Sequence, residues 1–317
     1  MASRGGRAGG SRGRGGGGGA SGRRSSSGGR GAGRSEAAGG RERVRREPRR
    51  PREPRRARSE LTSRIIVAIP AIAFASTIIA LGGIWFTVAV IVLGILCLGE
   101  LFDLYAEVEP VRLAGFVGVA GVILAAYLGD GFHVLLAAMA FFPVLFAVTL
   151  RQRQAGTLGM AVTMFGVAWI GLSFAHGVLL RELPHGGAIL VDILVGTFVG
   201  DSGAYLGGRW FGQRKLAPSV SPNKTVEGLA IGMFTAVLAT WLAGTYQDWL
   251  SGGDAILLGL GVAVAAPVGD LFESFVKRDA GTKDTGRLFG AHGGALDRLD
   301  AVMFSVVAGY YIWLALS

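Results

Sequence analysis

Cysteine is almost absent from this chain: Cys97 is the single cysteine among 317 residues. A lone cysteine excludes a disulfide within the chain and a metal site built from several thiolates. Cys97 lies in an apolar run, so we expect a small buried side chain there. The sequence also lacks a P-loop and a dinucleotide-binding fingerprint, because the glycine-rich stretch at 203–208 follows no predicted strand. These absences direct attention to the acidic and basic side chains.

Aromatic residues are missing from the first 60 positions, which consist mainly of Gly, Arg, Ser and Pro. This segment holds 18 of the 32 Lys and Arg residues but 5 of the 22 Asp and Glu residues, so its net charge is +13 and that of the remaining chain is −3. Such a composition cannot bury a core, and we expect residues 1–62 to form a disordered cytoplasmic tail. Base stacking needs aromatic side chains. We therefore expect the tail to contact anionic membrane lipids and no specific nucleic acid.

Charged residues are sparse in the rest of the chain, where long apolar runs follow one another. Half of all residues are hydrophobic and 17% are charged, which is typical of a polytopic membrane protein. The runs have the length of about 20 residues that crosses a bilayer. We predict that residues 63–317 form an all-α bundle of about nine transmembrane helices. These lie at 65–82, 84–101, 112–129, 132–150, 158–180, 186–208, 228–248, 254–276 and 298–316. Only Gly82-Gly83 separates the first two, and one continuous helix there would give eight.

Basic residues alternate from loop to loop along the predicted helices. They follow the fourth helix (Arg151 and Arg153) and recur in the loops at 209–224 and 277–287, whereas Arg181 is the exception in the opposite loops. Cytoplasmic loops of membrane proteins are rich in Lys and Arg. The pattern predicts an integral membrane protein with the amino terminus and both polar loops in the cytoplasm. We expect it in a bacterial plasma membrane.

Four carboxylates border the loop between the last two predicted helices. A charged group at bilayer depth costs about 2.5–3.5 kcal/mol and usually marks function. Asp270 and Glu273 are three residues apart and share a helix face, as do Asp297 and Asp300. Two helices joined by one loop can bring both pairs together around a cation, and oxygen-only ligands select hard ions such as Mg²⁺. The alternative is that nearby basic side chains pair with the acids: Lys277, Arg278 and Arg298.

Basic side chains and glycines fill the same loop, and these residue types bind phosphate. Arginine offers two parallel donors and lysine a mobile point charge, while glycines let backbone N–H groups approach an anion. Lys283 and His292 belong to this set, in which His292 could orient a phosphate or donate a proton. The loop therefore predicts a site for a polyphosphate beside a metal ion.

A second polar cluster runs from Asp201 to Ser221-Pro222-Asn223-Lys224-Thr225, directly before an apolar helix. Hydroxyls, amides and a lysine at a helix amino end can bind an anion. The alternative is ordinary helix capping by Asn223, Thr225 and Glu227. Glycines in the preceding helix, at 196, 200, 203 and 207, have the spacing that lets membrane helices pack closely. A third acidic pair, Glu100 and Asp103, either joins the pocket or faces water.

The polar motifs resemble the signature of phosphatidate cytidylyltransferases (CDP-diacylglycerol synthases), over residues 64–317. Two positions depart from the family pattern: Ala295 stands where a larger aliphatic residue is usual, and Asn223 where glycine is common. Neither departure removes a charge. The stretches that carry the resemblance are Ser274-Phe275-Val276-Lys277-Arg278, Lys283-Asp284-Thr285-Gly286, His292-Gly293-Gly294, Asp297-Arg298-Leu299-Asp300 and residues 221–228.

The resemblance implies transfer of CMP from CTP to phosphatidic acid, which forms CDP-diacylglycerol and pyrophosphate for phospholipid biosynthesis. It also implies Mg²⁺ as cofactor, with K⁺ as a second cation, and metal-holding roles for Asp270 and Asp297. Glu273 and Asp300 would support these two acids. We expect catalytic roles for Lys277, Arg278, Lys283, Asp284, His292 and Arg298, and substrate contacts from Asp201, Ser221, Asn223, Lys224 and Ser274.

Two other functions stay open from the sequence. One is transfer of CMP to a different membrane lipid phosphate, because acyl and ether tails would meet the same apolar helices. The other is a cation-coupled transporter that uses the carboxylates as ion sites, although transporters place such groups near the bilayer midplane between repeats. A homodimer is also left open.

Overall fold

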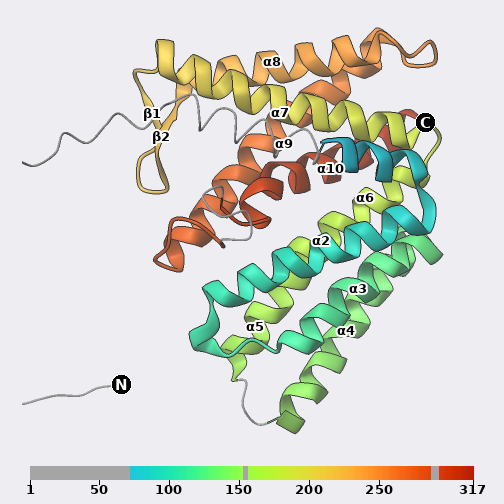
Figure 1. Ribbon diagram of the computed structural model, residues 1–317, viewed down its shortest axis with the longest axis vertical. Helices are drawn as coiled ribbons and strands as arrows, with labels where there is room; N and C mark the ends of the chain where they lie inside the picture. Colours follow the sequence, from blue (N-terminus) through green and yellow to red (C-terminus); the bar gives the residue numbers. More distant parts are fainter. Residues whose placement is uncertain (1–71, 153–155, 287–292) are drawn as a thin grey trace, which may run out of the picture. The chain divides into compact units, whose positions relative to one another are not determined.

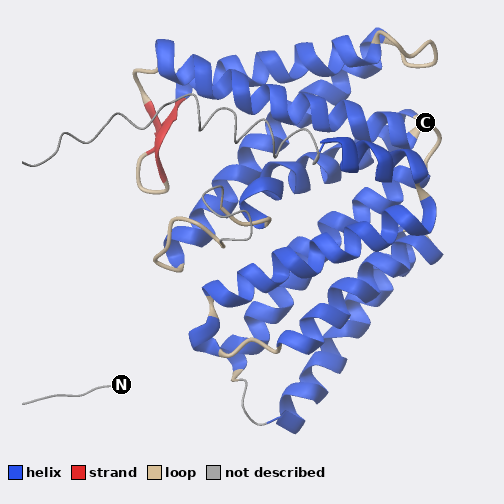
Figure 2. Ribbon diagram, in the orientation of Figure 1, coloured by secondary structure: helices blue, strands red, loops and turns tan. Residues whose placement is uncertain are grey.

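The computed structural model describes residues 72–152, 156–286 and 293–317, all within the compact unit Arg56–Ser317 (Figure 1). The predicted tail, the start of the first predicted helix and His292 lie outside the described residues. The described chain is mainly helical and also contains one two-stranded antiparallel hairpin (Figure 2). The helices are Ile72–Leu81, α2 (Gly83–Leu104), α3 (Arg112–Leu128), α4 (Gly131–Gln152), α5 (Thr157–Gly166), α6 (Leu172–Glu182), α7 (Gly186–Phe211), α8 (Val226–Gly244), α9 (Gly252–Asp279) and α10 (Leu296–Leu316). A 3-10 turn η1 (Ala106–Val108), a π-helical turn η2 (Val167–Gly171) and the strands β1 (Lys215–Ala217) and β2 (Ser221–Thr225) complete the elements.

Seven of the described helical stretches are long and apolar enough to cross a membrane. The chain is therefore an integral membrane protein with an all-α bundle, as predicted. Each of the nine predicted spans overlaps a described helix, and α5, η2 and α6 together make one continuous span, Thr157–Glu182. The count of nine is not confirmed, because Ile72–Leu81 and α3 are shorter apolar helices than the about 20 residues a span usually needs.

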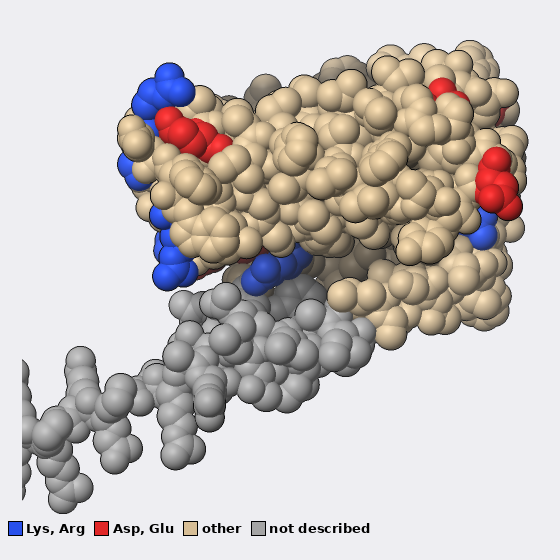
Figure 3. All heavy atoms as spheres, turned by 90° about the horizontal axis from the view of Figure 1, so that it is seen from above, with Lys and Arg blue, Asp and Glu red and all other residues tan. Residues whose placement is uncertain are grey.

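The charged side chains are distributed as a membrane protein requires. On the face drawn in Figure 3, a broad band of uncharged residues covers most of the surface, and most of the Lys and Arg side chains lie toward one end. Many large apolar side chains are exposed, including Trp85, Leu128 and Phe234. Exposed apolar surface on this scale fits contact with lipid rather than with water.

The glycine pair that separates the first two helices forms a true break. Gly82 and Gly83 have φ values of 63° and 50°, which lie in the left-handed region that glycine adopts most readily. The helix Ile72–Leu81 therefore ends before α2 begins. Arg181 caps this end, since its Nε donates to the Ile79 carbonyl over 2.8 Å and so satisfies a free group there. Arg181, the exception in the alternation of basic loops, thus has a structural partner.

The glycines of α7 serve helix packing, as predicted. Helices α7 and α8 run side by side (Figure 1). A Cβ atom added at Gly200 would stand 2.9 Å from Ala236 Cβ, and one added at Gly207 would stand 2.7 Å from Ile231 Cβ. Real side chains avoid such short contacts, so only glycine permits this approach of the two backbones. The close packing fixes the end of α7, which carries Asp201, against the start of α8.

Helices α9 and α10 also cross at close range, and this crossing sets the geometry of the site. A Cβ atom at Gly269 would lie 3.2 Å from Ala301 Cα, so the two backbones nearly touch beside Asp270 and Asp300. Next to this crossing, the ring of Phe272 packs against that of Trp169 in η2. The two rings meet edge-on, with 4.8 Å between their centres. The acidic ends of both helices are thereby held together.

Candidate active site where α9 and α10 meet

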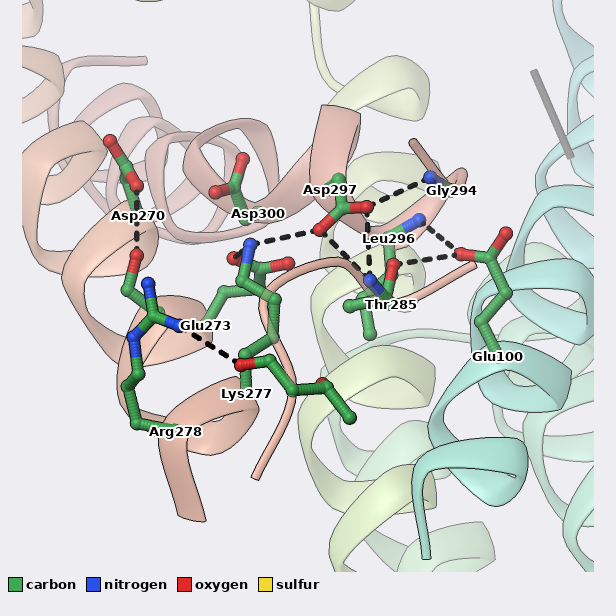
Figure 4. A network of polar contacts seen from close by, with 12 residues as sticks. Glu100, Asp270, Glu273, Lys277, Arg278, Thr285, Gly294, Leu296, Asp297 and Asp300 are labelled. Carbon is green, nitrogen blue, oxygen red and sulfur yellow. Dashed lines mark hydrogen bonds and ion pairs between the residues drawn. The ribbon is translucent and has the colours of Figure 1, made fainter. Parts of the chain in front are cut away.

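The acidic residues of α9 and α10 face a common region (Figure 4). Asp270, Glu273 and Lys277 recur at helical spacing along the last turns of α9, and Asp297 and Asp300 lie in the first turns of α10. Glu273 has no exposed surface and Asp300 is 9% exposed. The spacing argument from the sequence therefore predicts correctly that the two pairs come together at the joined helix ends.

Lys277 lies between two of these carboxylates. Its Nζ is 2.8 Å from Asp297 Oδ1 and also forms an ion pair with Glu273 (Figure 4). The lysine side chain is 14% exposed, so both pairs lie in a partly dehydrated environment where charges interact strongly. Salt bridging, which the sequence left open as an alternative, therefore operates for Glu273 and Asp297.

Asp297 also organises the loop that precedes it. Its carboxylate accepts hydrogen bonds from the backbone N–H groups of Gly294 (2.8 Å) and Thr285 (3.1 Å). Because Thr285 follows α9 and Gly294 precedes α10, a single side chain ties together both arms of the loop. Asp297 thus links the loop backbone to Lys277.

An ion pair links the second polar cluster to the first. Lys224 of β2 places its Nζ 2.6 Å from Asp270 Oδ2, and Ser274 donates its hydroxyl to the same carboxylate over 3.5 Å. The negative charges of Asp201 and Asp270 act on the buried Asp300 carboxylate, which accepts the N–H of Ala301. The structure therefore brings residues of three sequence segments, around 201, 224 and 270–300, into one site.

This site carries more acidic than basic groups. Lys224 and Lys277 offset two of its five formal negative charges, and the exposed Arg298 offsets a third, so the sum stays negative. The five carboxylates are those of Asp201, Asp270, Glu273, Asp297 and Asp300. A surplus of negative charge with oxygen donors only fits a hard divalent cation. In the part of the chain that the structure describes, no three such side chains lie close enough to hold a metal as they stand. The predicted ligand set therefore stays a prediction: Asp270, Glu273, Asp297 and Asp300.

The remaining predicted residues lie at the rim. Arg278 is exposed and donates to two backbone carbonyls, those of Val220 in the hairpin (3.2 Å) and Thr282 (3.1 Å). Lys283 and Asp284 are exposed in the loop after α9, and Asn223 is exposed on β2. Ser221 is partly buried on the same strand. These side chains surround the acidic site and are accessible to a ligand from outside.

Capping explains part of the second cluster. Thr225 is the N-cap of α8, and its hydroxyl accepts the N–H of Gly228 over 3.1 Å. Glu227 accepts the N–H groups of Gln213 and Arg214 and pairs with the Arg214 guanidinium. The capping alternative is thus confirmed for Thr225. Lys224 does not take part in it and points to Asp270 instead.

The third acidic pair separates into two different roles. Asp103 forms an exposed ion pair with Arg112 over 2.6 Å. Glu100 lies at the site, where its carboxylate accepts the N–H groups of Ala295 and Leu296, each over 2.9 Å. The only sequence signal for Glu100 is a charged residue inside an apolar helix, which marks a candidate but not its partner.

Tyr105 joins the end of α2 to the end of α9. Its hydroxyl donates to Asp279 Oδ2 over 3.0 Å. Burial, together with the neighbouring Asp279 carboxylate, raises the pKa of Tyr105 to about 12. The phenol therefore stays protonated at neutral pH and keeps its role as a donor.

Comparison with known sequences places these residues among related proteins. The chain matches the cytidylyltransferase family over residues 62–316. A phosphatidate cytidylyltransferase of Synechocystis sp. is 32% identical over 287 residues, which cover 79% of this chain and 95% of that protein. One of Staphylococcus aureus is 33% identical over 251 residues, 76% of this chain and 94% of that protein. A third, of Mycobacterium bovis, is 33% identical over 153 residues, 48% of this chain and 50% of that protein. The family match includes both polar motifs.

Proposed function

The chain belongs to the cytidylyltransferase family, and we propose on this basis that it transfers CMP from CTP to phosphatidic acid, giving CDP-diacylglycerol and pyrophosphate. The structural observation that carries the proposal is the ion pair of Lys224 with Asp270. It joins the two polar motifs at the ends of membrane-spanning helices, one helical turn from Glu273 and two turns from Lys277. A membrane enzyme that joins a soluble nucleotide to a lipid needs its polar groups at such a position.

The basic residues supply partners for the triphosphate and the lipid phosphate. A lysine Nζ can exchange a carboxylate for a phosphate oxygen, since both are anionic oxygen acceptors. Lys224 and Lys277 stand among the acids, whereas Arg278 and Lys283 are exposed nearby. Arg298 adds a guanidinium that can hold a phosphate by two parallel bonds. The arrangement lets bound phosphates replace the internal ion pairs.

The reaction needs no covalent intermediate on the protein. A phosphate oxygen of the lipid attacks the α-phosphorus of CTP, and a new P–O bond forms. The bond from that phosphorus to the oxygen bridging to the β-phosphate breaks, and pyrophosphate leaves with the electron pair. The attacking oxygen is already anionic, so the chain contributes positioning and charge neutralisation rather than proton abstraction.

The acids fit a divalent cation, which is Mg²⁺ in our proposal, with K⁺ as a second cation. The residues that would hold it are Asp270, Glu273, Asp297 and Asp300. Their oxygen donors and the acidic surplus of the site support this assignment. A bound divalent cation neutralises charge on the triphosphate and on the leaving pyrophosphate.

We place the site at the cytoplasmic face of a bacterial plasma membrane. Basic residues are concentrated in the connections on the side of the site, Arg209 to Lys224 and Lys277 to Arg287, which supports this orientation. CTP is then available from the cytosol. A homodimer stays a prediction, for which cross-linking of the purified protein is the test.

An incorporation assay with purified protein in detergent tests the proposal. CTP is supplied with phosphatidic acid, an ether-linked analogue or a polyprenyl phosphate, each with and without EDTA. We expect a CDP-lipid from phosphatidic acid and loss of product with EDTA. Product from the polyprenyl phosphate alone would overturn the substrate assignment. The transporter alternative is not favoured, and turnover in detergent without an ion gradient would be inconsistent with it.

A further inference from the structure

Glu100 contacts the loop between α9 and α10 from a distant part of the chain. Figure 4 shows its side chain extending from α2 toward Leu296 and Thr285. Three donors converge on its carboxylate: the N–H of Ala295 (2.9 Å), the N–H of Leu296 (2.9 Å) and the hydroxyl of Thr285 (3.3 Å). Thr285 lies in the first arm of the loop, Ala295 ends the second arm and Leu296 begins α10. One carboxylate therefore holds both arms of the loop from outside.

The contact replaces a missing helix cap. The first turn of a helix has free N–H groups, which a side chain of the N-cap residue usually satisfies. The N-cap of α10 is Ala295, whose side chain cannot accept a hydrogen bond. Glu100 supplies the acceptor from α2, and its negative charge also suits the positive end of the α10 dipole.

The surrounding sequence leaves room for this carboxylate. A Cβ atom at Gly286 would stand 2.6 Å from Glu100 Oε1, and one at Gly294 would also collide with the carboxylate. Leu296 and Ala295 are buried. Two glycines and two buried backbone amides therefore surround the Glu100 carboxylate closely.

The donors that hold the Glu100 carboxylate lie next to those that hold the Asp297 carboxylate. Thr285 donates its N–H to Asp297 and its hydroxyl to Glu100, while Gly294 donates to Asp297 and the next residue, Ala295, donates to Glu100. Any displacement of Glu100 therefore moves the same backbone that holds Asp297, and with it the ion pair to Lys277. Tyr105, five residues further along the chain from Glu100, contacts the C-terminal end of α9 through Asp279.

We propose that Glu100 is a positioning residue for the transfer reaction, which acts through Thr285 and the start of α10 to fix Asp297 and Lys277. This inference rests on the proposed function. It predicts a larger effect on kcat than on KM for CTP, because in the proposed function Asp297 and Lys277 act on the phosphate groups whose bonds change. A misplacement of about 1 Å at a reacting centre can lower the rate about 100-fold.

The test compares Glu100→Gln with Asp103→Asn, a matched loss of one carboxylate three residues away on the same helix. The amide that replaces the Glu100 carboxylate keeps one oxygen acceptor and turns an NH₂ group toward a donor. For Glu100→Gln we expect kcat to fall about 10- to 100-fold, with KM for CTP changed by less than about threefold. Asp103→Asn should behave as the unaltered protein, because its carboxylate pairs with Arg112 at the surface.

Variants of Thr285 provide a second comparison, which remains informative if Glu100→Gln fails to fold. Thr285→Ser keeps the hydroxyl donor and should keep kcat, whereas Thr285→Val removes one of the three donors to Glu100 and should lower kcat about threefold to tenfold. An unchanged kcat in both Glu100→Gln and Thr285→Val would overturn the proposal. So would an effect confined to KM for CTP, or equal losses in the Ser and Val variants.

Hydrogen exchange distinguishes failure of this inference from failure of the proposed function. The amides of Ala295 and Leu296 should exchange faster in Glu100→Gln than in Asp103→Asn, whichever substrate the protein uses. If the unaltered protein made no CDP-lipid but the amides were deprotected, the proposed function would fall and the positioning contact would stand. Unchanged exchange would refute the contact itself.

Discussion

Replacing Lys277 by methionine removes the cation that bridges Glu273 and Asp297. Methionine has a similar length and no charge, so the substitution tests charge rather than volume. Asp297 keeps its two backbone donors, but Glu273 is fully buried and loses its ion-pair partner. Breaking a buried ion pair by removing one partner costs about 3–5 kcal/mol. Because 1 kcal/mol shifts Tm by roughly 2–4 °C in a domain of this size, we expect Tm to fall by about 6–20 °C.

The assay is thermal unfolding of detergent-solubilised protein, with the double variant Glu273→Gln/Lys277→Met as the decisive comparison. Neutralising Glu273 removes the unpaired buried charge, so the double variant should recover most of the lost Tm. Lys283→Met serves as control, since Lys283 is an exposed lysine of the adjoining loop, and it should change stability by less than about 0.5 kcal/mol. An unchanged Tm in Lys277→Met, or a double variant no more stable than the single one, would refute the reasoning.

Three further predictions concern activity and packing. Asp297→Asn should lower kcat more than about 100-fold, with normal membrane insertion, because its NH₂ group replaces an oxygen that accepts from Thr285 and from either Lys277 or Gly294; near-normal turnover would exclude a catalytic role. Gly200→Val should cost about 1–3 kcal/mol in thermal unfolding, because Ala236 lies against the added Cβ, whereas Gly121→Ala, at an open position, should be neutral or slightly stabilising. Deleting residues 1–58, which precede the family match, should leave turnover unchanged, and a collapse of activity would assign the tail a direct role.

Much of the fold follows from apolar length and from glycine positions. An apolar run long enough for a bilayer predicts a helix wherever it occurs, and the pair Gly82-Gly83 marks a break because both residues adopt positive φ. The hairpin of β1 and β2 has no apolar alternation that would predict it, because its strands are short and polar. Its conformation depends instead on contacts made after the helices assemble, such as the bond from Arg278 to Val220.

The site is predictable only as far as local spacing reaches. The interval of three residues places Asp270 and Glu273 on one face, and the joining loop brings Asp297 near them. The same interval treats Glu100 and Asp103 alike, yet one reaches the N-terminus of α10, 196 residues away, and the other pairs with a surface arginine. Helix periodicity describes a single element, whereas these partners are chosen by tertiary packing.

The position of a radiolabel tests the central claim most directly. Purified protein is supplied with phosphatidic acid and with CTP labelled either at the α-phosphorus or at the γ-phosphorus, and the lipid phase is then extracted. Transfer of CMP predicts that the α label enters the lipid and that the γ label stays in the aqueous phase as pyrophosphate. Label in the lipid from the γ-phosphorus, or from neither position, would contradict the account.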